Sequence, residues 1–381
     1  MVEEVLVMRI VSVTTGRADV GHLEPVWREI TARWRKGLEL TILNVGSHQL
    51  PAEWEGFSFF KLPRWWMSDH QGRDSSESIA QNMAAVVSNA ASVYTLVAPD
   101  VILVFGDRYE ALAVVSAALP FGIPIAHIGG GDETTGSYDN QIRHAITKMA
   151  HLHFVPHEEA QKRVLAMGEQ GWRVHLTGLP SLDGIRQWLE DGDNGPEPER
   201  GEELVVIFHS PTLELETAEQ QAREVGKALA QIGRPIKGFI PGCDVLHEKV
   251  RRAVVDQCIG ALESEWLDQE QPSDFYRTLS EAACLVGNSS AGIMEACSFG
   301  LPVVNIGSRQ EGRVRPENVV DVVGNRKAFV KAIKYALRPE FRTFCQGLVN
   351  PYGDGHAAER IVEALAALPA KDLLLKKEWP R

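Results

Sequence analysis

The sequence has little cysteine and no excess of basic residues, and both shortages exclude classes of protein. Its five cysteines contain no C-x-x-C pair, so we expect reduced thiols rather than a disulfide framework. Asp and Glu number 51 against 39 Lys and Arg, which gives a net charge of −12. An acidic chain repels polyanions, which argues against nucleic acid and anionic membranes as partners. A small anion held by a few local arginines is compatible with this charge.

Long hydrophobic runs and the common nucleotide-binding motifs are also missing. No apolar run approaches the ~18 residues that a membrane span requires. The first residues, MVEEVLVMRIV, carry acids where a secretory signal carries basic residues, so we expect a cytoplasmic protein. Neither G-x-x-x-x-G-K-S/T nor G-x-G-x-x-G follows a predicted strand. The sequence therefore supports neither ATP hydrolysis nor an NAD cofactor.

What the chain does contain is a repeated order of strand, loop and helix. Segments 8–14 and 38–45 are predicted strands, and apolar residues between them recur at helical spacing. Pro25 is expected in the first turn of that helix, because a deeper proline costs ~3 kcal/mol. Further strands are predicted at 101–105, 124–127, 151–156, 204–208, 235–240, 284–287 and 302–306, and helices at 110–119, 139–150, 158–167, 217–231, 275–283 and 290–299. Apolar strands that alternate with helices indicate a parallel sheet covered on both faces.

The pattern is interrupted by DGDNGPEPERGEE at 191–203, an acidic segment almost free of apolar residues. We predict an exposed linker there. A chain of 381 residues is too long for one core, and two doubly wound α/β halves account for the pattern on each side of the linker. Ligands bind outside the carboxyl ends of the strands in such sheets. We therefore expect the site in the cleft between the halves.

The most specific local motif is GNSSAG at 287–292, directly after a predicted strand. Small residues at a strand-to-helix turn let backbone N–H groups approach a phosphate, and the helix N-terminus adds partial positive charge. Ser289 and Ser290 would add hydroxyl donors; the alternative is that Ser290 only caps the helix. Glu295 can face the same helix end and accept the two hydroxyls of a ribose, although an exposed helical Glu is the commoner case.

Arginines gather in two loops that also follow strands. Arg309, Arg313 and Arg315 lie within GSRQEGRVRPEN, and Arg17 lies within TTGRAD. Guanidinium groups placed in this way would clamp a diphosphate with paired hydrogen bonds. A solvated basic loop is the alternative.

Acid–base candidates gather mainly in the first half. Asp107 lies in GDRYE after a strand, and Asp132 lies in the small-residue loop HIGGGDETTG. Asp139 opens the next helix and shares a face with Arg143; a polar face of this kind usually points to solvent. In the second half, His209 follows a strand and is a candidate general acid or base.

Two histidines in the run HLH at 151–153, with His157 nearby, raise the question of a metal site. Alternate residues of a strand point to the same side, but no third ligand follows at metal spacing. We therefore predict no metal, and expect these histidines to be buried and hydrogen-bonded.

Together the motifs resemble those of the hydrolysing UDP-N-acetylglucosamine 2-epimerases of the bacterial sialic-acid pathway. The matching segments are TTGRAD, FGDRYEALA, the frame D-x-x-I-R-H-x-I-T-K-M-x-H-L-H-F, GNSSAGIMEA and FGLPVVNIGSRQEGRVRPENV. They keep their order and span nearly the whole chain. The resemblance implies a glycosyltransferase-B-like α/β fold of two Rossmann-like domains with the active site in the interdomain cleft.

The resemblance also implies a division of the chain into domains with different roles in substrate binding. An N-terminal domain at 1–180 would carry the sugar-site acids and a C-terminal domain at 181–360 would bind UDP, while a C-terminal helix at 361–381 packs back on the first domain. Homodimers or homotetramers are expected. The residues implied in binding UDP are Arg17, Ser289, Ser290, Arg309 and Arg313, with Glu295 on the ribose. The residues implied at the sugar are Asp107, Asp132, Asp139, Arg143 and His209.

The implied reaction needs no cofactor. A proton leaves C2 of the sugar while the C1–O bond to UDP breaks, and water adds to the resulting 2-acetamidoglucal to release a free sugar of the ManNAc type. The departing diphosphate needs strong stabilisation, which arginines and a helix N-terminus supply.

The chain departs from the family pattern at three places near the sugar. The segment Gly129-Gly130-Gly131-Asp132 replaces the family pattern H-x-G-G-E, and Thr135 replaces an acidic residue. The segment His209-Ser210-Pro211-Thr212 replaces the family pattern H-P-x-T. We therefore expect retained UDP recognition and a modified sugar, for instance a 2,4-diacetamido-trideoxyhexose. The alternatives are UDP-GlcNAc itself, a non-hydrolysing 2-epimerase, a UDP-sugar glycosyltransferase of the same fold, and a non-catalytic nucleotide-sugar binder.

Overall fold

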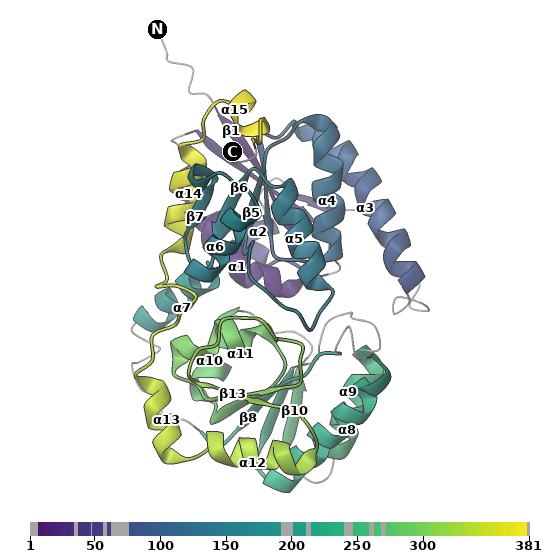
Figure 1. Ribbon diagram of the computed structural model, residues 1–381, viewed down its shortest axis with the longest axis vertical. Helices are drawn as coiled ribbons and strands as arrows, with labels where there is room; N and C mark the ends of the chain where they lie inside the picture. The colour runs from purple at the N-terminus through teal and green to yellow at the C-terminus, as the bar shows by residue number, and fades with distance from the viewer. Residues whose placement is uncertain are drawn as a thin grey trace.

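The chain forms two parallel sheets, each with helices on both faces, and the two units lie one above the other in Figure 1. The computed structural model describes residues 7–33, 37–46, 48–55, 59–61, 76–191, 201–210, 215–239, 247–258, 263–267 and 272–378. Within these ranges one sheet has seven strands and the other has six. The predicted class, two Rossmann-like α/β units, is confirmed.

The first sheet has the strand order β3-β2-β1-β4-β5-β6-β7. Its strands are β1 (Met8–Thr14), β2 (Leu38–Asn44), β3 (Phe59–Lys61), β4 (Val101–Phe105), β5 (Ile125–Ile128), β6 (Leu152–Val155) and β7 (Val174–Leu176). Its helices are α1 (Arg17–Ala32), α2 (Ala52–Glu55), α3 (Ser76–Val97), α4 (Tyr109–Ala118), α5 (Asp139–Met149) and α6 (Glu158–Ala166). β1 lies between β2 and β4, in the register Met8 to Leu38 and Ile10 to Val101.

The second sheet has the order β10-β9-β8-β11-β12-β13. Its strands are β8 (Leu204–Ile207), β9 (Ile236–Phe239), β10 (Ser264–Leu267), β11 (Cys284–Gly287), β12 (Val303–Ile306) and β13 (Val319–Val322). The helices of this half are α7 (Ser181–Glu190), α8 (Leu215–Ile232), α9 (His247–Cys258), α10 (Pro272–Glu281), α11 (Ser290–Met294), α12 (Arg326–Ala336) and α13 (Pro339–Gln346).

Apolar clusters on both faces of each sheet hold the layers together. In the first unit α1 covers one face, and α3, α4 and α5 cover the other. In the second unit α8, α9 and α12 cover one face, while α7, α10 and the segment after α11 cover the other. Central strands such as β4, VILVF, are apolar throughout because both of their faces are covered.

Helix α1 begins earlier than the sequence suggested. It starts at Arg17, so Pro25 lies in the helix interior and the prediction of a first-turn proline is wrong. Asp19 fixes the early start, because its Oδ2 accepts hydrogen bonds from the N–H and the hydroxyl of Thr15, both at 2.7 Å. The buried apolar stripe that contains Trp27 offsets the hydrogen bond that a proline cannot donate.

The helix predicted at 290–299 is in fact two short helices. α11 ends at Met294, and the tighter 3-10 turns of Ala296–Phe299 follow. The change occurs at Glu295, whose side chain is buried.

Some features of the sequence lie outside the described residues. They are the middle of the acidic linker (192–200), Trp34 after the first helix, Cys243, and the Pro211-Thr212 pair. The remaining four cysteines are free thiols, as predicted. Of the helices that the structure describes, none has the length and apolar character of a transmembrane segment.

The chain crosses between the two units twice, at neighbouring places. The first crossing leads from β7 into α7, and the second leads from α13 into α14 (Ala357–Ala366). The N–H of Leu179 donates to the carbonyl oxygen of Tyr352 at 2.9 Å, which joins the crossings directly. Asp183 of α7 accepts hydrogen bonds from the N–H groups of Ala357 and Ala358, at 2.9 and 2.8 Å, and so satisfies the free N-terminus of α14.

The last described segment returns to the first unit, where it is drawn in yellow in Figure 1. α14 packs on α1 and shares its apolar cluster, and α15 (Lys371–Leu375) follows. The buried Arg173 donates to the carbonyl oxygens of Leu374, Leu373 and Lys376 at 2.9, 3.0 and 2.7 Å. The guanidinium group of Arg173 thus anchors the C-terminal segment to the first unit. The domain limits at residues 180 and 360 remain a prediction.

We predict that Arg173→Met destabilises the protein by ~2–4 kcal/mol, because buried carbonyl groups lose their donor. Urea unfolding measures the change, and limited proteolysis reports earlier cleavage of the C-terminal segment. The control is Arg223→Met on the exposed side of α8, which should change stability by less than ~0.5 kcal/mol. Equal stability of the two variants would contradict the anchoring role of Arg173.

Candidate active site

The loop that follows β5 meets the loop that follows β12, so the carboxyl ends of the two sheets come together. The N–H of Thr135 donates to the carbonyl oxygen of Glu311 at 2.8 Å. Gly136 lies so close to the second loop that a Cβ there would stand 1.9 Å from the carbonyl oxygen of Ser308. The side chains predicted for the site project from these two loops and their neighbours.

Asp107 lies in the turn after β4, held by an arginine from α5. The preceding Gly106 has a φ of +76°, which favours glycine. Arg143 donates to the Asp107 carboxylate in an ion pair. The same guanidinium reaches the carbonyl oxygen of Asp132 and the hydroxyl of Thr134, each at 3.1 Å. Arg143 therefore fixes Asp107 relative to the loop after β5.

The face of α5 that carries Arg143 is buried, which excludes the alternative of a solvent-facing polar surface at this residue. Arg143 is 2% exposed and Thr147 is fully buried. The Thr147 hydroxyl lies 3.2 Å from Nδ1 of His127, whose Nε2 lies 2.8 Å from the carbonyl oxygen of Gly106. These polar partners, together with the Asp107 carboxylate, allow the polar face to turn inward.

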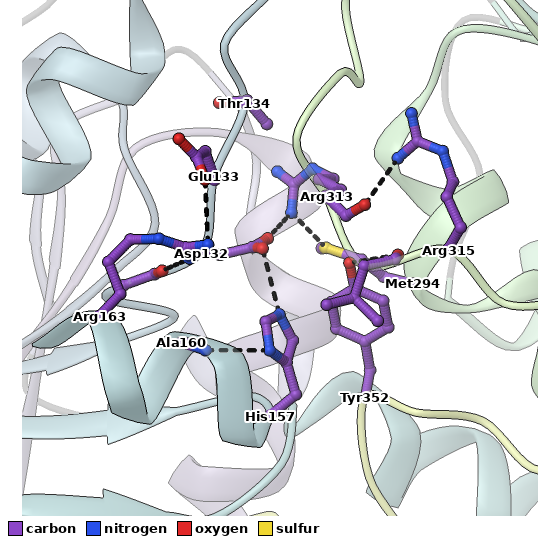
Figure 2. Close-up of polar contacts among 12 residues, drawn as sticks. Asp132, Glu133, Thr134, His157, Ala160, Arg163, Met294, Arg313, Arg315 and Tyr352 are labelled. Atoms are coloured by element: carbon purple, nitrogen blue, oxygen red, sulfur yellow. Dashed lines mark hydrogen bonds and ion pairs between the residues drawn. The ribbon is translucent and has the colours of Figure 1, made fainter.

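Asp132 connects the two units. Figure 2 shows its carboxylate between Arg313 of the second unit and His157 of the first. It forms an ion pair with Arg313, and its Oδ1 lies 3.2 Å from Nε2 of His157. Arg313 also donates from Nε to Oε1 of Gln310 at 2.8 Å. The sugar-site acid and the diphosphate arginine of the prediction are thus in direct contact.

The surroundings favour the ionised form of both carboxylates, although Asp132 is buried and Asp107 is partly buried. Burial alone would raise the pKa of each. The charge of Arg143, followed by that of Arg313, outweighs burial and lowers the pKa of Asp107. Arg313 and the hydrogen bond from His157 hold the pKa of Asp132 well below its usual range. The site therefore presents two carboxylates that can accept a proton.

The GNSSAG turn forms the N-terminus of α11. Ser289 is the cap, since its hydroxyl oxygen accepts a hydrogen bond from the N–H of Ala291 at 3.3 Å. Ser290 is the first helical residue, so the alternative in which Ser290 is the cap is wrong. Arg309 donates to the carbonyl oxygen of Asn288 at 3.2 Å, which places its guanidinium beside the turn.

Glu295 is buried between the two units, unlike the exposed glutamate that is commoner on helices. Its Oε1 lies 3.8 Å from Nε2 of His22, whose ring stacks on Phe105 with centroids 4.0 Å apart. Burial raises the pKa of Glu295 to about 7 and lowers that of His22 to about 3. Between these values both groups are neutral, so the contact is not an ion pair over that range.

Three further predicted residues lie on neighbouring elements. Arg17 is exposed at the start of α1, and Asp139 is the first residue of α5. His209 follows β8, and its backbone lies against Asn288 of the GNSSAG turn. The structure thus places Asp107, Asp132 and Arg143 in one network with Arg313, while His209 lies at the GNSSAG turn.

The histidines of the HLH run have structural partners. Nε2 of His153 lies 3.1 Å from the Glu169 carboxylate, and Nδ1 of His151 accepts a hydrogen bond from the N–H of Ile125 at 3.1 Å. The described part of the chain contains no group of three side chains that would hold a metal ion.

Three further residues of the site, Gln310, Asn288 and His22, were not predicted from the sequence. Gln310 lies between Arg309 and Arg313, and Asn288 lies inside GNSSAG. Both residues therefore belong to motifs that the sequence already indicates as part of a site. His22 lies beside the apolar stripe of α1, and no local pattern marks it as part of a site.

Comparisons with known proteins cover most of the chain and agree with one another. A family model described as UDP-N-acetylglucosamine 2-epimerase matches residues 31–366. A hydrolysing UDP-N,N'-diacetylbacillosamine 2-epimerase of Legionella pneumophila is 30% identical and covers 98% of this chain and 99% of its own. A hydrolysing GDP/UDP-N,N'-diacetylbacillosamine 2-epimerase of Campylobacter jejuni is also 30% identical, over 75% of this chain and 77% of its own.

The architecture also matches solved structures. The crystal structure of UDP-GlcNAc 2-epimerase from Neisseria meningitidis bound to UDP-GlcNAc superposes with a TM-score of 0.76 at 18% identity, covering 94% of this chain and 99% of that one. At this level of identity the likeness establishes the fold.

We predict that the buried Glu295 makes stability depend on pH. Its pKa is raised from 4.5 to about 7, so the protonated form stabilises the fold, and this stabilisation is lost as the pH rises from 4.5 through 7. Relative to Glu295→Gln, the wild type should lose ~2.5 kcal/mol of unfolding free energy between about pH 5 and about pH 8. Urea unfolding at both values measures the difference. Glu340→Gln, on an exposed position of α13, is the control; parallel pH profiles for wild type and Glu295→Gln would refute the prediction.

Proposed function

The chain belongs to the UDP-N-acetylglucosamine 2-epimerase family, and on this premise we propose that it is a hydrolysing 2-epimerase. It converts a UDP-linked 2-acetamido sugar into UDP and the free 2-epimer. The contact between Asp132 and Arg313 carries the proposal. It supports one site formed by the acid-bearing loops of one unit and the arginine-bearing loop of the other.

The nucleotide occupies the side formed by the second unit. The hydroxyl groups of Ser289 and Ser290 and the N-terminus of α11 receive the diphosphate. Arg309 and Arg313 bind its oxygens from the loop after β12, and Arg17 approaches from the start of α1. Glu295 receives the ribose hydroxyl groups. The arginine loop and the helix end thus supply the positive charge that an acidic chain lacks overall.

Arrival of the diphosphate changes the partner of Arg313. In the structure this guanidinium is paired with Asp132. A diphosphate competes for the same donor, and each Arg313 hydrogen bond that moves to phosphate releases the Asp132 carboxylate. The released carboxylate then faces the sugar that the nucleotide carries.

Elimination followed by hydration accounts for the overall change. An ionised carboxylate, Asp107 or Asp132, takes the proton from C2 of the sugar. The C2–H electron pair forms the C1=C2 bond while the C1–O bond breaks, and its electrons leave with UDP. Water then adds OH to C1, and C2 receives a proton on the opposite face. Asp139, Arg143 and His209 complete the polar lining of the sugar site.

The sugar we propose is a 2,4-diacetamido-2,4,6-trideoxyhexose. Two relatives at 30% identity carry N,N'-diacetylbacillosamine in their names, and the chain departs from the family pattern beside the sugar. The description of the family itself favours a second candidate, UDP-N-acetylglucosamine. Both substrates share the nucleotide and the C2 acetamido group, so the same elimination serves either one.

Incubation with each of the two UDP-sugars in D2O tests the proposal. We expect release of UDP, deuterium at C2 of a free 2-epimer, and a higher kcat/KM for the 2,4-diacetamido substrate. A product that stays linked to UDP would indicate a non-hydrolysing epimerase, and UDP release without deuterium at C2 would indicate transfer chemistry. UDP binding with no turnover of either sugar would contradict an enzymatic role.

We predict that Asp107→Asn lowers turnover by ~10²- to 10⁴-fold, because the amide cannot accept the proton that the carboxylate takes. Arg143 can still donate to the amide oxygen, so the affinity for UDP should stay within about twofold of the wild-type value. Turnover assays and calorimetric titration with UDP measure the two quantities. Asp256→Asn, at an exposed position of α9, is the matched control. A variant that retains full activity would remove Asp107 from the chemistry.

A further inference from the structure

Gln310 bridges the arginine loop and the GNSSAG turn with both ends of its side chain. Its Oε1 accepts a hydrogen bond from Nε of Arg313 at 2.8 Å, and its Nε2 donates to the carbonyl oxygen of Asn288 at 2.9 Å. The side chain is 2% exposed. A buried amide with both ends satisfied has one orientation available to it.

The carbonyl group that receives Gln310 is itself held firmly. Asn288 donates its backbone N–H to Ile207 at 3.1 Å. Its side chain pairs with the backbone of His209, accepting at Oδ1 (2.7 Å) and donating from Nδ2 (2.9 Å). The preceding Gly287 leaves no room for a side chain, since a Cβ would stand 1.9 Å from the carbonyl oxygen of Ile207. Gln310 is therefore attached to a rigid part of the second unit.

The strongest other contact of Arg313 is exchangeable, because it is the ion pair with Asp132 that spans the two units. Arg313 also interacts with the side chain of Tyr352, and its Nη1 lies against Sδ of Met294 at 3.1 Å. An arginine side chain has many rotamers, and fixing one of them costs conformational entropy. The hydrogen bond at Nε holds the plane of the guanidinium and leaves its terminal nitrogens for an anion.

We propose that Gln310 is a positioning residue for nucleotide binding: it fixes Arg313 relative to the GNSSAG turn, so that both face the diphosphate together. The inference rests on the proposed function, in which Arg313 binds the diphosphate. Gln310 does not touch the nucleotide itself. It acts through Arg313, by reducing the orientational freedom that Arg313 would otherwise lose on binding.

A double-mutant cycle with UDP as the probe tests this coupling. Gln310→Met keeps the length of the side chain and removes both hydrogen bonds, and we expect it to raise the Kd for UDP about tenfold. Arg313→Ala should raise the Kd further. Adding Gln310→Met to Arg313→Ala should then change the Kd by less than about twofold, because the residue through which Gln310 acts is gone.

Arg313→Lys provides a second test that leaves Gln310 intact. Lysine keeps the charge but has no Nε–H for Gln310, so we expect a loss comparable to that of Gln310→Met. UDP binding at the wild-type level by this variant, or by Gln310→Met, would overturn the inference. Additive effects in the cycle would also overturn it, since a purely structural role of Gln310 would weaken binding with or without Arg313.

The outcomes separate this inference from the proposed function. Failure of the wild type to bind UDP would refute both. Tight binding by the wild type, weak binding by Arg313→Ala and unchanged binding by Gln310→Met would refute only the role of Gln310. Gln346→Met, on an exposed position of α13, is the control for the substitution, and thermal melting of each variant verifies its fold.

Discussion

The buried ion pair between Asp132 and Arg313 is the contact on which the arrangement of the site depends. Two charges taken out of water are tolerated only where further hydrogen bonds satisfy their remaining atoms, and here His157 serves the acid and Gln310 the arginine. The pair joins two units that otherwise fold around separate cores. Under the proposed function, an incoming diphosphate would replace the carboxylate as the anion beside Arg313. Nucleotide binding and release of a sugar-facing acid would then be one event.

Much of the fold could be predicted because its central strands are short, apolar and bounded by loops. The strand at 284–287 has the predicted limits, and the strand at 101–105 does as well. Edge strands such as β10 (SEWL) and β13 (VVDV) were not predicted, because four mixed residues show no periodicity. The start of α1 was misjudged because Asp19 acts through the turn before it, a contact that apolar spacing does not reveal.

The site could be predicted to the extent that topology alone determines it. Parallel strands end at one edge of a sheet, so Asp107 and the GNSSAG turn were expected near a ligand. Arg143 points inward because the Asp107 carboxylate lies opposite it. The charge of an arginine, taken alone, favours a position exposed to solvent. Gln310 contacts Asn288 and His22 contacts Glu295. These residues are far apart along the chain, so the contacts exist only in the folded protein.

The return of the C-terminal segment to the first unit has a consequence for synthesis on the ribosome. The apolar face of α1 is covered partly by α14, and Arg173 binds the segment that follows it. The second sheet, from β8 to β13, needs no residue from either end of the chain. The first unit emerges from the ribosome before the second. It therefore completes its fold only after all the residues of the second sheet have emerged. Until α14 has emerged, the nascent chain carries an uncovered apolar surface on α1 that invites chaperones or misassembly.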